Sequence, residues 1–289
     1  YRTGRGGYVS LRLMARRKNP MRGRTAVVTG AGSGIGRALA LDFASKGCPV
    51  AIADADAEGL AITESMVVGP VIARELDVRD RGGFMAFAAE VDQWSPAPIG
   101  AVVNNAGVTT SQSFIDSSPE DDEWVLEVNL GGVINGSHAF LPLLVRQDSG
   151  TLANVSSVFG LMGFPFQSAY CASKHGVRGF TESIRHEMRN TGVNIAVIHP
   201  GGVKTNIVSN ARFHQDDAGN VDKGDAAERF ANAARTTPER AAEIIVSGIE
   251  RKDPRIRVGA DAVVIDALMR VAPVRYYGII ERMIPLLER

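Results

Sequence analysis

Cysteine is scarce in this sequence: Cys48 and Cys171 are the only two among 289 residues. Two thiols are too few for a disulfide framework or a thiolate metal site, and such usage is typical of a reducing compartment. The five histidines show no spacing that suggests shared ligation of a metal. We therefore expect a cytoplasmic protein that holds no metal.

Long hydrophobic runs are missing as well. The apolar stretches fall far short of the ~18 residues of a membrane-spanning helix, so we expect no span. Acidic side chains are absent from residues 1–24, which carry eight of the 32 Arg and Lys residues; because the whole chain is neutral, the remainder carries a charge of −8. We interpret residues 1–22 as a basic, disordered leader, and the acidic remainder argues against a nucleic-acid partner.

Short β-branched runs alternate with segments of helical periodicity from residue 25 onward. Strands that are apolar almost throughout favour a parallel sheet that is covered by helices on both faces. We predict an α/β fold of the Rossmann type, doubly wound around a seven-stranded parallel sheet. The predicted strands are residues 25–30, 49–54, 71–78, 101–107, 151–157, 194–202 and 255–259.

The predicted catalytic domain covers residues 23–260 and includes one unusual connection. Residues 206–236 are polar and too long for an ordinary connector, which is typical of a lid. Beyond the domain, residues 261–289 have apolar residues at helical spacing, divided by Pro273. We expect this helical extension to pack on the protein itself or on a neighbouring subunit, and contact with a membrane surface is the alternative.

A glycine-rich turn joins the first predicted strand to the first predicted helix. Gly30, Gly34 and Gly36 follow the pattern G-x-x-x-G-x-G. Glycines let backbone amides approach a pyrophosphate closely, and the helix N-terminus adds partial positive charge. Glycine-rich turns also serve ordinary tight packing, so this turn alone does not establish a dinucleotide site.

Acidic residues close the second and third predicted strands. Asp54 follows Gly36 by eighteen residues, near the spacing at which a carboxylate accepts hydrogen bonds from the cofactor ribose. Such a carboxylate would repel the 2′-phosphate of NADP, and Ala55 stands where an arginine could have bound that phosphate. We therefore predict NAD as the cofactor and NADP as less favoured; a solvated aspartate at a strand end is the alternative. Asp77 would lie beside the adenine.

The segment SAYCASKHG places Tyr170 and Lys174 one helical turn apart on one face. Alone, this pair could be a surface tyrosine beside a flexible lysine. Three further stretches accompany it: NNAG at 104–107, VNLGG with Asn129, and NVSSVFG, whose Ser157 precedes Tyr170 by thirteen residues. In this order the motifs resemble the short-chain dehydrogenase/reductase family, in its branch of single-domain enzymes, over about residues 23–260.

The resemblance implies a role for each matching residue. Tyr170 would be the acid/base, and Lys174 would be the lysine that accompanies it in this family. Ser157 would be the serine that orients the carbonyl, and Asn129 would be the asparagine that steadies a water relay. Thr205 would bond the nicotinamide carboxamide, whereas Asn104 and Ser156 are interpreted as structural. The implied cofactor-binding residues are Gly30, Ser33, Gly34, Ile35, Gly36, Asp54, Asp77, Val78, Asn105, Ala106, Gly107, Tyr170, Lys174, Pro200, Gly201, Val203 and Thr205.

The implied chemistry requires that the pKa of the tyrosine hydroxyl be lowered. A free tyrosine has a pKa of ~10, which makes it a poor base at neutral pH. The ammonium group of Lys174 and a positively charged oxidised nicotinamide would both favour the phenolate of Tyr170. We therefore expect the pKa of Tyr170 to be lowered toward the working range.

Large apolar side chains follow Ser157 and recur in the lid. Phe159, Met162, Phe164 and Ile207 are the predicted substrate-pocket residues, and few cations stand near them. We expect an NAD(H)-dependent oxidoreductase that interconverts a bulky, apolar secondary alcohol and its ketone or aldehyde, such as a steroid-, retinoid- or fatty-carbonyl-like compound. The alternatives are a small diketone or acetoin-type reductase and a non-catalytic nucleotide-binding regulatory protein. The family resemblance also implies a homodimer or homotetramer.

Overall fold

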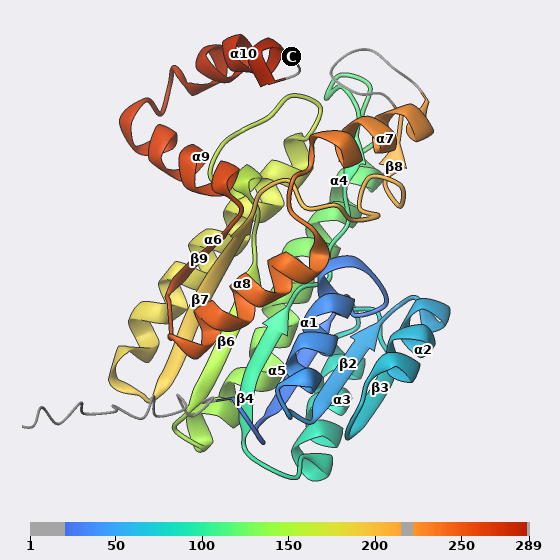
Figure 1. Cartoon of the computed structure of the whole chain (residues 1–289), viewed down its shortest axis with the longest axis vertical. Helices are drawn as coiled ribbons and strands as arrows, with labels where there is room; N and C mark the ends of the chain where they lie inside the picture. The colour runs from blue at the N-terminus through green and yellow to red at the C-terminus, as the bar shows by residue number, and fades with distance from the viewer. Residues whose placement is uncertain (1–20, 215–221, 288–289) are drawn as a thin grey trace, which may run out of the picture.

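The computed structural model describes residues 21–214 and 222–287, with side chains as far as residue 282. Seven strands form one parallel sheet in the order β3–β2–β1–β4–β6–β7–β9, which confirms the predicted architecture (Figure 1). A short parallel pair, β5 and β8, lies outside this sheet. The strands are β1 (Thr25–Thr29), β2 (Val50–Asp54), β3 (Val71–Glu75), β4 (Ile99–Asn104), β5 (Thr110–Ser111), β6 (Gly150–Val155), β7 (Val193–Pro200), β8 (Arg212–Phe213) and β9 (Arg255–Val258).

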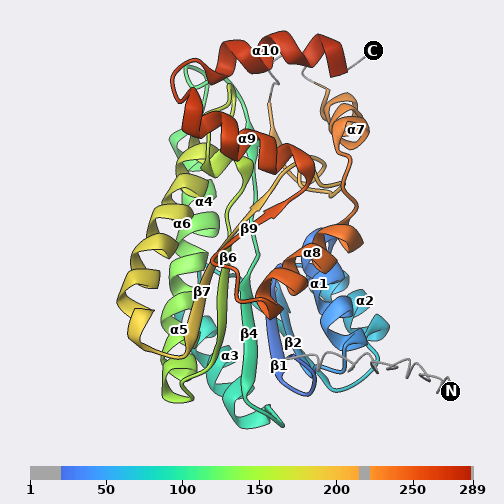
Figure 2. The same ribbon diagram turned by 60° about the vertical axis from the view of Figure 1, so that its left-hand side comes forward.

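Helices cover both faces of the sheet, as the two views in Figures 1 and 2 show. A π-helical turn at Glu127–Gly131 joins α4 to α5 without a break. The α-helices are α1 (Gly34–Ser45), α2 (Ala57–Met66), α3 (Arg81–Trp94), α4 (Pro119–Leu126), α5 (Gly132–Arg146), α6 (Ser168–Glu187), α7 (Lys223–Ala233), α8 (Pro238–Glu250), α9 (Ala260–Val271) and α10 (Tyr276–Leu287).

Each face of the sheet has its own hydrophobic core. On one face, Phe43 of α1 and Ile245 of α8 are completely buried against the strands. On the other face, Phe87 of α3 meets Phe140 of α5 edge to face, with ring centroids 5.9 Å apart. The inner strands are buried on both faces and have apolar side chains at most positions, and this is why they could be recognised in the sequence. The edge strand β3 is partly exposed.

The order of the strands creates a crevice. The chain runs outward from β1 through β2 to β3, and then returns to add β4 on the opposite side of β1. In an open α/β sheet, ligands bind at such a reversal, outside the carboxyl ends of the strands. Gly30 after β1 and Asn105 after β4 therefore lie at the edge where a cofactor is expected.

The helix starts differ in how they are capped. The side chains of Asp56, Ser118 and Thr237 accept backbone N–H bonds at the starts of α2, α4 and α8. Ser33, at the start of α1, makes no such side-chain bond. The first turn of α1 thus keeps its amides and its positive end for an anion.

One helical stretch passes as a membrane span by length and composition alone. Residues Pro119–Arg146 have a window of mean hydropathy 1.3, and 56% of that window is buried inside the protein. Phe140 and Leu144 are completely buried against the sheet. Charged residues interrupt the start of this stretch, and its buried apolar side chains belong to the core.

The predicted domain boundaries stay a prediction, but one residue of the predicted leader lies in the core. Met21, which the sequence placed in the leader, is only 4% exposed and belongs to the core, where its carbonyl accepts a bond from Cys48 Sγ. Residues 1–20 and part of the predicted lid, 215–221, lie outside the described residues. The extension forms the two helices α9 and α10 on either side of Pro273.

Candidate active site

The glycine turn fits a dinucleotide phosphate by close packing as well as by sequence. A methyl group added at Gly36 would lie 1.9 Å from the carbonyl oxygen of Gly30, and one at Gly30 would lie 2.7 Å from Cα of Ala106. Gly34 has φ +52 and faces Thr205, whose Cγ2 would lie 3.2 Å from an added methyl. The turn can therefore exist only with glycine, and its backbone lies open at the uncapped start of α1. The residues present fit the cofactor that the sequence predicted.

The turn is held by residues at the end of β4. Thr29 Oγ1 accepts hydrogen bonds from the amides of Asn105 and Ala106 at 3.0 and 3.2 Å. Asn105 Nδ2 in turn donates to the carbonyl of Thr29 at 2.9 Å. These bonds join the loops that follow β1 and β4 into one floor, whereas contact of Asn105 and Ala106 with the cofactor stays a prediction.

Asp54 lies beside this floor at the end of β2. Its Oδ2 accepts the amide of Gly32 at 2.7 Å, and its Oδ1 accepts the amide of Asp56 at 2.9 Å. The carboxylate is half-buried and fixed in direction by these two bonds. A second group nearby, Arg37, bonds the carbonyls of Gly32 and Gly59 rather than the carboxylate.

Asp77 and Val78 were predicted within the third strand, but β3 ends at Glu75 and both residues lie in the loop that follows it. Asp77 forms an ion pair with Arg79, at 2.6 Å between Oδ2 and Nη2, and hydrogen bonds from Arg79 lower its pKa. Val78 is buried, and its carbonyl accepts a bond from Asn135 of α5 at 3.0 Å. An open hollow lined in part by Ala55, Leu76 and Asp77 lies here, where the adenine is expected.

Ser157, Tyr170 and Lys174 come together at the carboxyl ends of β6 and β7. Ser157 follows β6, whereas Tyr170 and Lys174 stand one turn apart on α6. All three are buried, at 8%, 9% and 3% exposure. The Ser157 side chain is near enough to Tyr170 to act on its pKa, and Lys174 Nζ lies 5.6 Å from the centre of the Tyr170 ring. The structure therefore assembles the predicted trio.

Burial changes the pKa of both Tyr170 and Lys174 on α6. It raises the pKa of Tyr170 to about 12, although the Ser157 side chain opposes this in part. It lowers the pKa of Lys174 to about 8. The expectation of a lowered tyrosine pKa is therefore wrong for the protein without cofactor, because the cost of removing the phenolate from water exceeds the opposing effect of Ser157. Lowering by an oxidised nicotinamide stays a prediction.

Asn129 and Gly107 complete this part of the site. Asn129 is fully buried in the π-helical turn, where its Oδ1 accepts the amide of Val108 at 2.8 Å and its Nδ2 donates to Ser173 Oγ at 3.0 Å. A methyl group on Gly107 would lie 3.1 Å from Asn129 Oδ1 and 3.2 Å from Lys174 Nζ. Asn129 thus connects the loop after β4 to α6. Its role in a water relay stays a prediction.

The segment after β7 lies close to the same crevice. The amide of Gly202 donates to Asp261 Oδ2 at 2.6 Å, and a side chain on Gly201 would collide with that carboxylate. Val203 is buried in the core, and Thr205 lies against Gly34 as described. Pro200 ends β7. The extension thus holds the predicted nicotinamide segment through the first turn of α9.

A row of aromatic rings leads away from Tyr170. Phe159 lies edge-on to Tyr170 at 6.1 Å and stacks on Phe164 at 5.0 Å, and Phe164 meets Tyr277 of α10 at 6.4 Å. Ile207 packs against the cluster that contains Tyr170. Met162 is buried at 4% exposure. The predicted pocket residues lie in one region, although their contact with a substrate stays a prediction.

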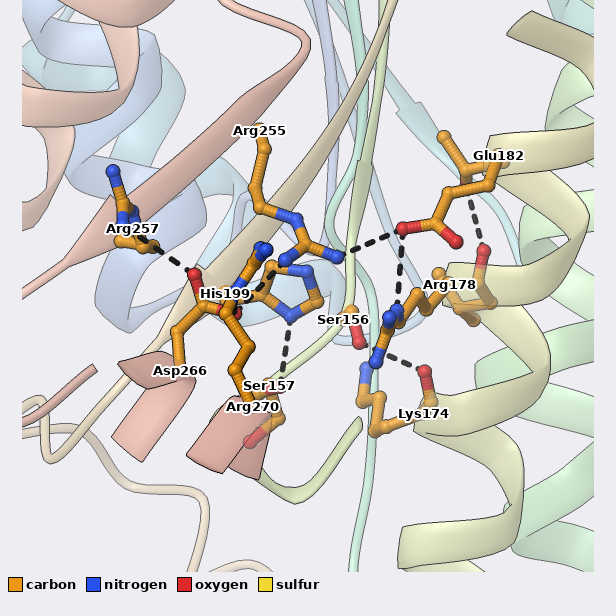
Figure 3. Close-up of polar contacts among 12 residues, drawn as sticks. Ser156, Ser157, Lys174, Arg178, Glu182, His199, Arg255, Arg257, Asp266 and Arg270 are labelled. Atoms are coloured by element: carbon orange, nitrogen blue, oxygen red, sulfur yellow. Dashed lines mark hydrogen bonds and ion pairs between the residues drawn. The ribbon is translucent and has the colours of Figure 1, made fainter. Parts of the chain in front are cut away.

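The two residues interpreted as structural are confirmed as such by their bonds. Asn104 Nδ2 donates to Asn154 Oδ1 at 2.8 Å and so joins β4 to β6. Ser156 Oγ donates to the carbonyl of Lys174 at 2.8 Å (Figure 3). Ser156 therefore faces the helix backbone, and only its neighbour Ser157 faces the tyrosine.

This geometry agrees with the comparisons. A family model described as short chain dehydrogenase matches residues 24–216, and the chain belongs to the short-chain dehydrogenase/reductase family. It is an oxidoreductase of that type. A putative oxidoreductase, SadH of Mycobacterium tuberculosis, is 39% identical over 264 residues, which cover 89% of this chain and 94% of SadH.

Solved structures show the same fold with either cofactor. A short-chain dehydrogenase/reductase from Burkholderia phymatum in complex with NAD is 29% identical, with a TM-score of 0.78 and coverage of 87% of this chain and 94% of that chain. Serine dehydrogenase complexed with NADP+ is 27% identical, with a TM-score of 0.69 and coverage of 76% and 87%. The family therefore uses NAD or NADP, and neither structure assigns one to this chain.

Several residues of the site had not been predicted. Thr29 and Arg37 hold the glycine turn, and Asp261 holds the segment after β7. From α10, Tyr276 bonds the backbone of Gly163 and Tyr277 reaches the aromatic row. Thr29 directly precedes Gly30, so its position beside the glycine turn could have identified it as a residue of the site. The residues of the extension lie far along the chain, and no local pattern connects them with the site.

Proposed function

We propose that the protein is an NAD(H)-dependent oxidoreductase that interconverts a bulky, apolar secondary alcohol and its ketone or aldehyde. The assembly of Ser157, Tyr170 and Lys174 beside the aromatic row is the observation that carries this proposal. The intact trio also disfavours the alternative of a non-catalytic nucleotide-binding protein, which would not need it.

Each residue of the trio has a defined task in carbonyl reduction. Ser157 Oγ donates a hydrogen bond to the carbonyl oxygen, and the Tyr170 hydroxyl gives its proton to the same oxygen as negative charge develops there. Lys174 provides positive charge beside the phenol and stabilises the phenolate that remains. The bound nicotinamide supplies the hydride to the carbonyl carbon. In alcohol oxidation, Tyr170 takes the proton back.

The preference for NAD rests on Asp54. Its carboxylate is fixed by the amides of Gly32 and Asp56 at the end of β2. A fixed negative charge accepts ribose hydroxyl groups and repels a 2′-phosphate. Arg37, the nearby cation, is held by backbone carbonyls and by Thr63, so it supports the turn.

Calorimetric titration with NADH and NADPH tests this preference. We expect NADH to bind more tightly than NADPH. We expect Asp54→Asn to reduce the ratio of the two Kd values about tenfold, or ~1.4 kcal/mol. Asparagine removes the charge and keeps one side-chain oxygen, which can accept one of the two amide hydrogen bonds. Asp56→Asn is the matched control, because asparagine still caps α2. Tighter NADPH binding by the unaltered protein would overturn the cofactor assignment, whereas binding of neither would overturn the catalytic function.

The substrate class follows from the aromatic row. Phe159, Phe164 and Tyr277 offer flat apolar surface, and Phe159 touches the ring of the proposed acid. Such surface favours a ligand with large apolar area over a small polar one. A small diketone or acetoin-type substrate remains the alternative.

We also propose that the working form is a homodimer or homotetramer in the cytoplasm. The proposal rests on the resemblance to family members that pair through the helices carrying Asn129 and Tyr170. Light scattering of the purified protein tests it, and a monomeric mass would contradict it.

A further inference from the structure

A histidine lies directly behind the serine of the site. His199 stands in β7 and is completely buried. Its Nδ1 lies 3.0 Å from the carbonyl oxygen of Ser157 (Figure 3). No task in the proposed reaction has been given to this side chain, and its sequence position gave no reason to assign one.

The hydrogen bond fixes the form of the imidazole. A carbonyl oxygen only accepts, so Nδ1 must carry the proton. Burial lowers the pKa of His199 to about 4, and the positive charges of Arg255 and Arg178 act in the same direction. The ring is therefore neutral at physiological pH, with its hydrogen on Nδ1 and a lone pair on Nε2, for which the described residues provide no hydrogen-bond partner.

The surroundings keep the ring in this state. Figure 3 shows the guanidinium group of Arg255 beside the imidazole. Arg255 is itself held by Asp266 of α9 at 2.8 Å and by Glu182 of α6 at 2.9 Å. Further cations complete the cluster: Arg178 bonds Glu182, while Arg257 and Arg270 bond Asp266. Arg255 is thus fixed at a place where it opposes protonation of the ring.

Ser157 is held at its backbone from two sides. Its carbonyl accepts the His199 bond and also the amide of Gly160 at 3.0 Å. The preceding residue, Ser156, donates its amide to Ile198 and its hydroxyl to Lys174. The His199 bond therefore adds a side-chain anchor from β7 at the residue whose hydroxyl must meet the substrate oxygen.

We propose that His199 is a positioning residue that sets the direction of Ser157 through its backbone carbonyl. The proposal rests on the proposed function, because it matters only if Ser157 orients a carbonyl. His199 touches neither substrate nor cofactor, and its effect must pass through Ser157. Loss of the donor then lowers turnover and leaves cofactor binding unchanged.

Two substitutions separate the hydrogen bond from the volume of the ring. His199→Phe keeps a planar ring and removes the donor, whereas His199→Asn places an amide N–H near the position of Nδ1. We expect His199→Phe to lower kcat about 5- to 10-fold, the scale of one lost hydrogen bond, with the Kd of NADH unchanged. His199→Asn should recover most of this loss. Equal losses in both variants would show a role in packing and overturn the proposal.

A double-mutant cycle tests the route of the effect. In a Ser157→Ala background, His199→Phe should change the residual turnover less than twofold, because the hydroxyl that it positions is already gone. The same 5- to 10-fold loss in both backgrounds would overturn the proposal. Melting curves of each variant show that it is folded before its kinetics are compared.

The ring itself can be observed without turnover. Nitrogen chemical shifts of His199 in the full-length protein should show a neutral ring protonated at Nδ1 at pH 7 and still neutral at pH 5.5. Protonation at Nε2, or a charged ring at pH 7, would overturn the inference. If the unaltered protein reduced no carbonyl, the proposed function would fail, and the chemical shifts would still decide whether the His199–Ser157 bond exists.

Discussion

At the scale of single residues, the site combines two side chains that are costly to bury. Lys174 is 3% exposed, and its Nζ has one hydrogen bond in the described structure, to the carbonyl of Val155 at 3.1 Å. Tyr170 is buried beside it with a raised pKa. A lysine in such a place does not favour folding, because its charge is removed from water. Its presence there is explained by chemistry rather than by stability.

This leads to a prediction for stability without added cofactor. The pKa of Lys174 is lowered from 10.5 to about 8, so the folded state disfavours the charged form. Lys174→Met should therefore raise the free energy of unfolding at pH 7, by about 2 kcal/mol after allowance for the lost bond, while it abolishes turnover. This difference in stability between the variant and the unaltered protein should be full below pH 8 and shrink as pH rises to 10.5. In that range the unaltered protein becomes more stable, because its folded lysine has released the proton that the unfolded chain still binds.

Denaturant titrations at several pH values measure this effect. Lys204→Met is the control, because Lys204 is exposed and should contribute little. A variant at position 174 that is less stable than the unaltered protein at pH 7 would show that the buried ammonium is stabilised by interactions beyond the bond to Val155.

The sequence predicted those residues whose roles follow from local motifs. Ser157, Tyr170 and Lys174 were found because their motifs, in their order along the chain, resemble those of the short-chain dehydrogenase/reductase family. The raised pKa of Tyr170 and the bond of His199 to Ser157 could not be predicted, since both depend on how deeply side chains are buried and on contacts between distant strands.

At the scale of elements, the two C-terminal helices reach the site at three points. Asp261 in α9 holds the amide of Gly202, and Asp266 in α9 holds Arg255 of β9. Tyr276 of α10 exchanges hydrogen bonds of 3.0 Å with the amide and the carbonyl of Gly163. The sequence indicated the two helices through their periodicity, but it left open what they pack against, because Gly202 lies 59 residues from Asp261 and Gly163 lies 113 residues from Tyr276 in the chain.

These contacts predict a role for α10 in substrate choice. Tyr277→Leu should raise KM for bulky apolar ketones about three- to tenfold, because it removes the last ring of the row. The KM for a small ketone should stay unchanged. Val274→Ala is the control, since Val274 is 88% exposed in the same segment. Equal changes of KM for large and small ketones would contradict a substrate role for this ring.

At the scale of the whole molecule, the sheet was the most predictable feature. Its inner strands are buried on both faces and appear in the sequence as short apolar runs, and all seven strands were found. The short pair β5 and β8 was missed because two residues per strand leave no pattern. The buried stretch Pro119–Arg146 shows that a helix of the core can be as long and as apolar as a membrane span requires.

The central claim is that this chain reduces an apolar ketone with NADH through Tyr170. The most direct measurement is the loss of NADH absorbance with a series of ketones from acetoin to steroid size, for the unaltered protein and for Tyr170→Phe. We predict turnover that favours large apolar ketones and falls at least ~100-fold in the variant, because the phenol that donates the proton is gone. Turnover that is undiminished in Tyr170→Phe, or confined to the smallest ketones, would contradict the account.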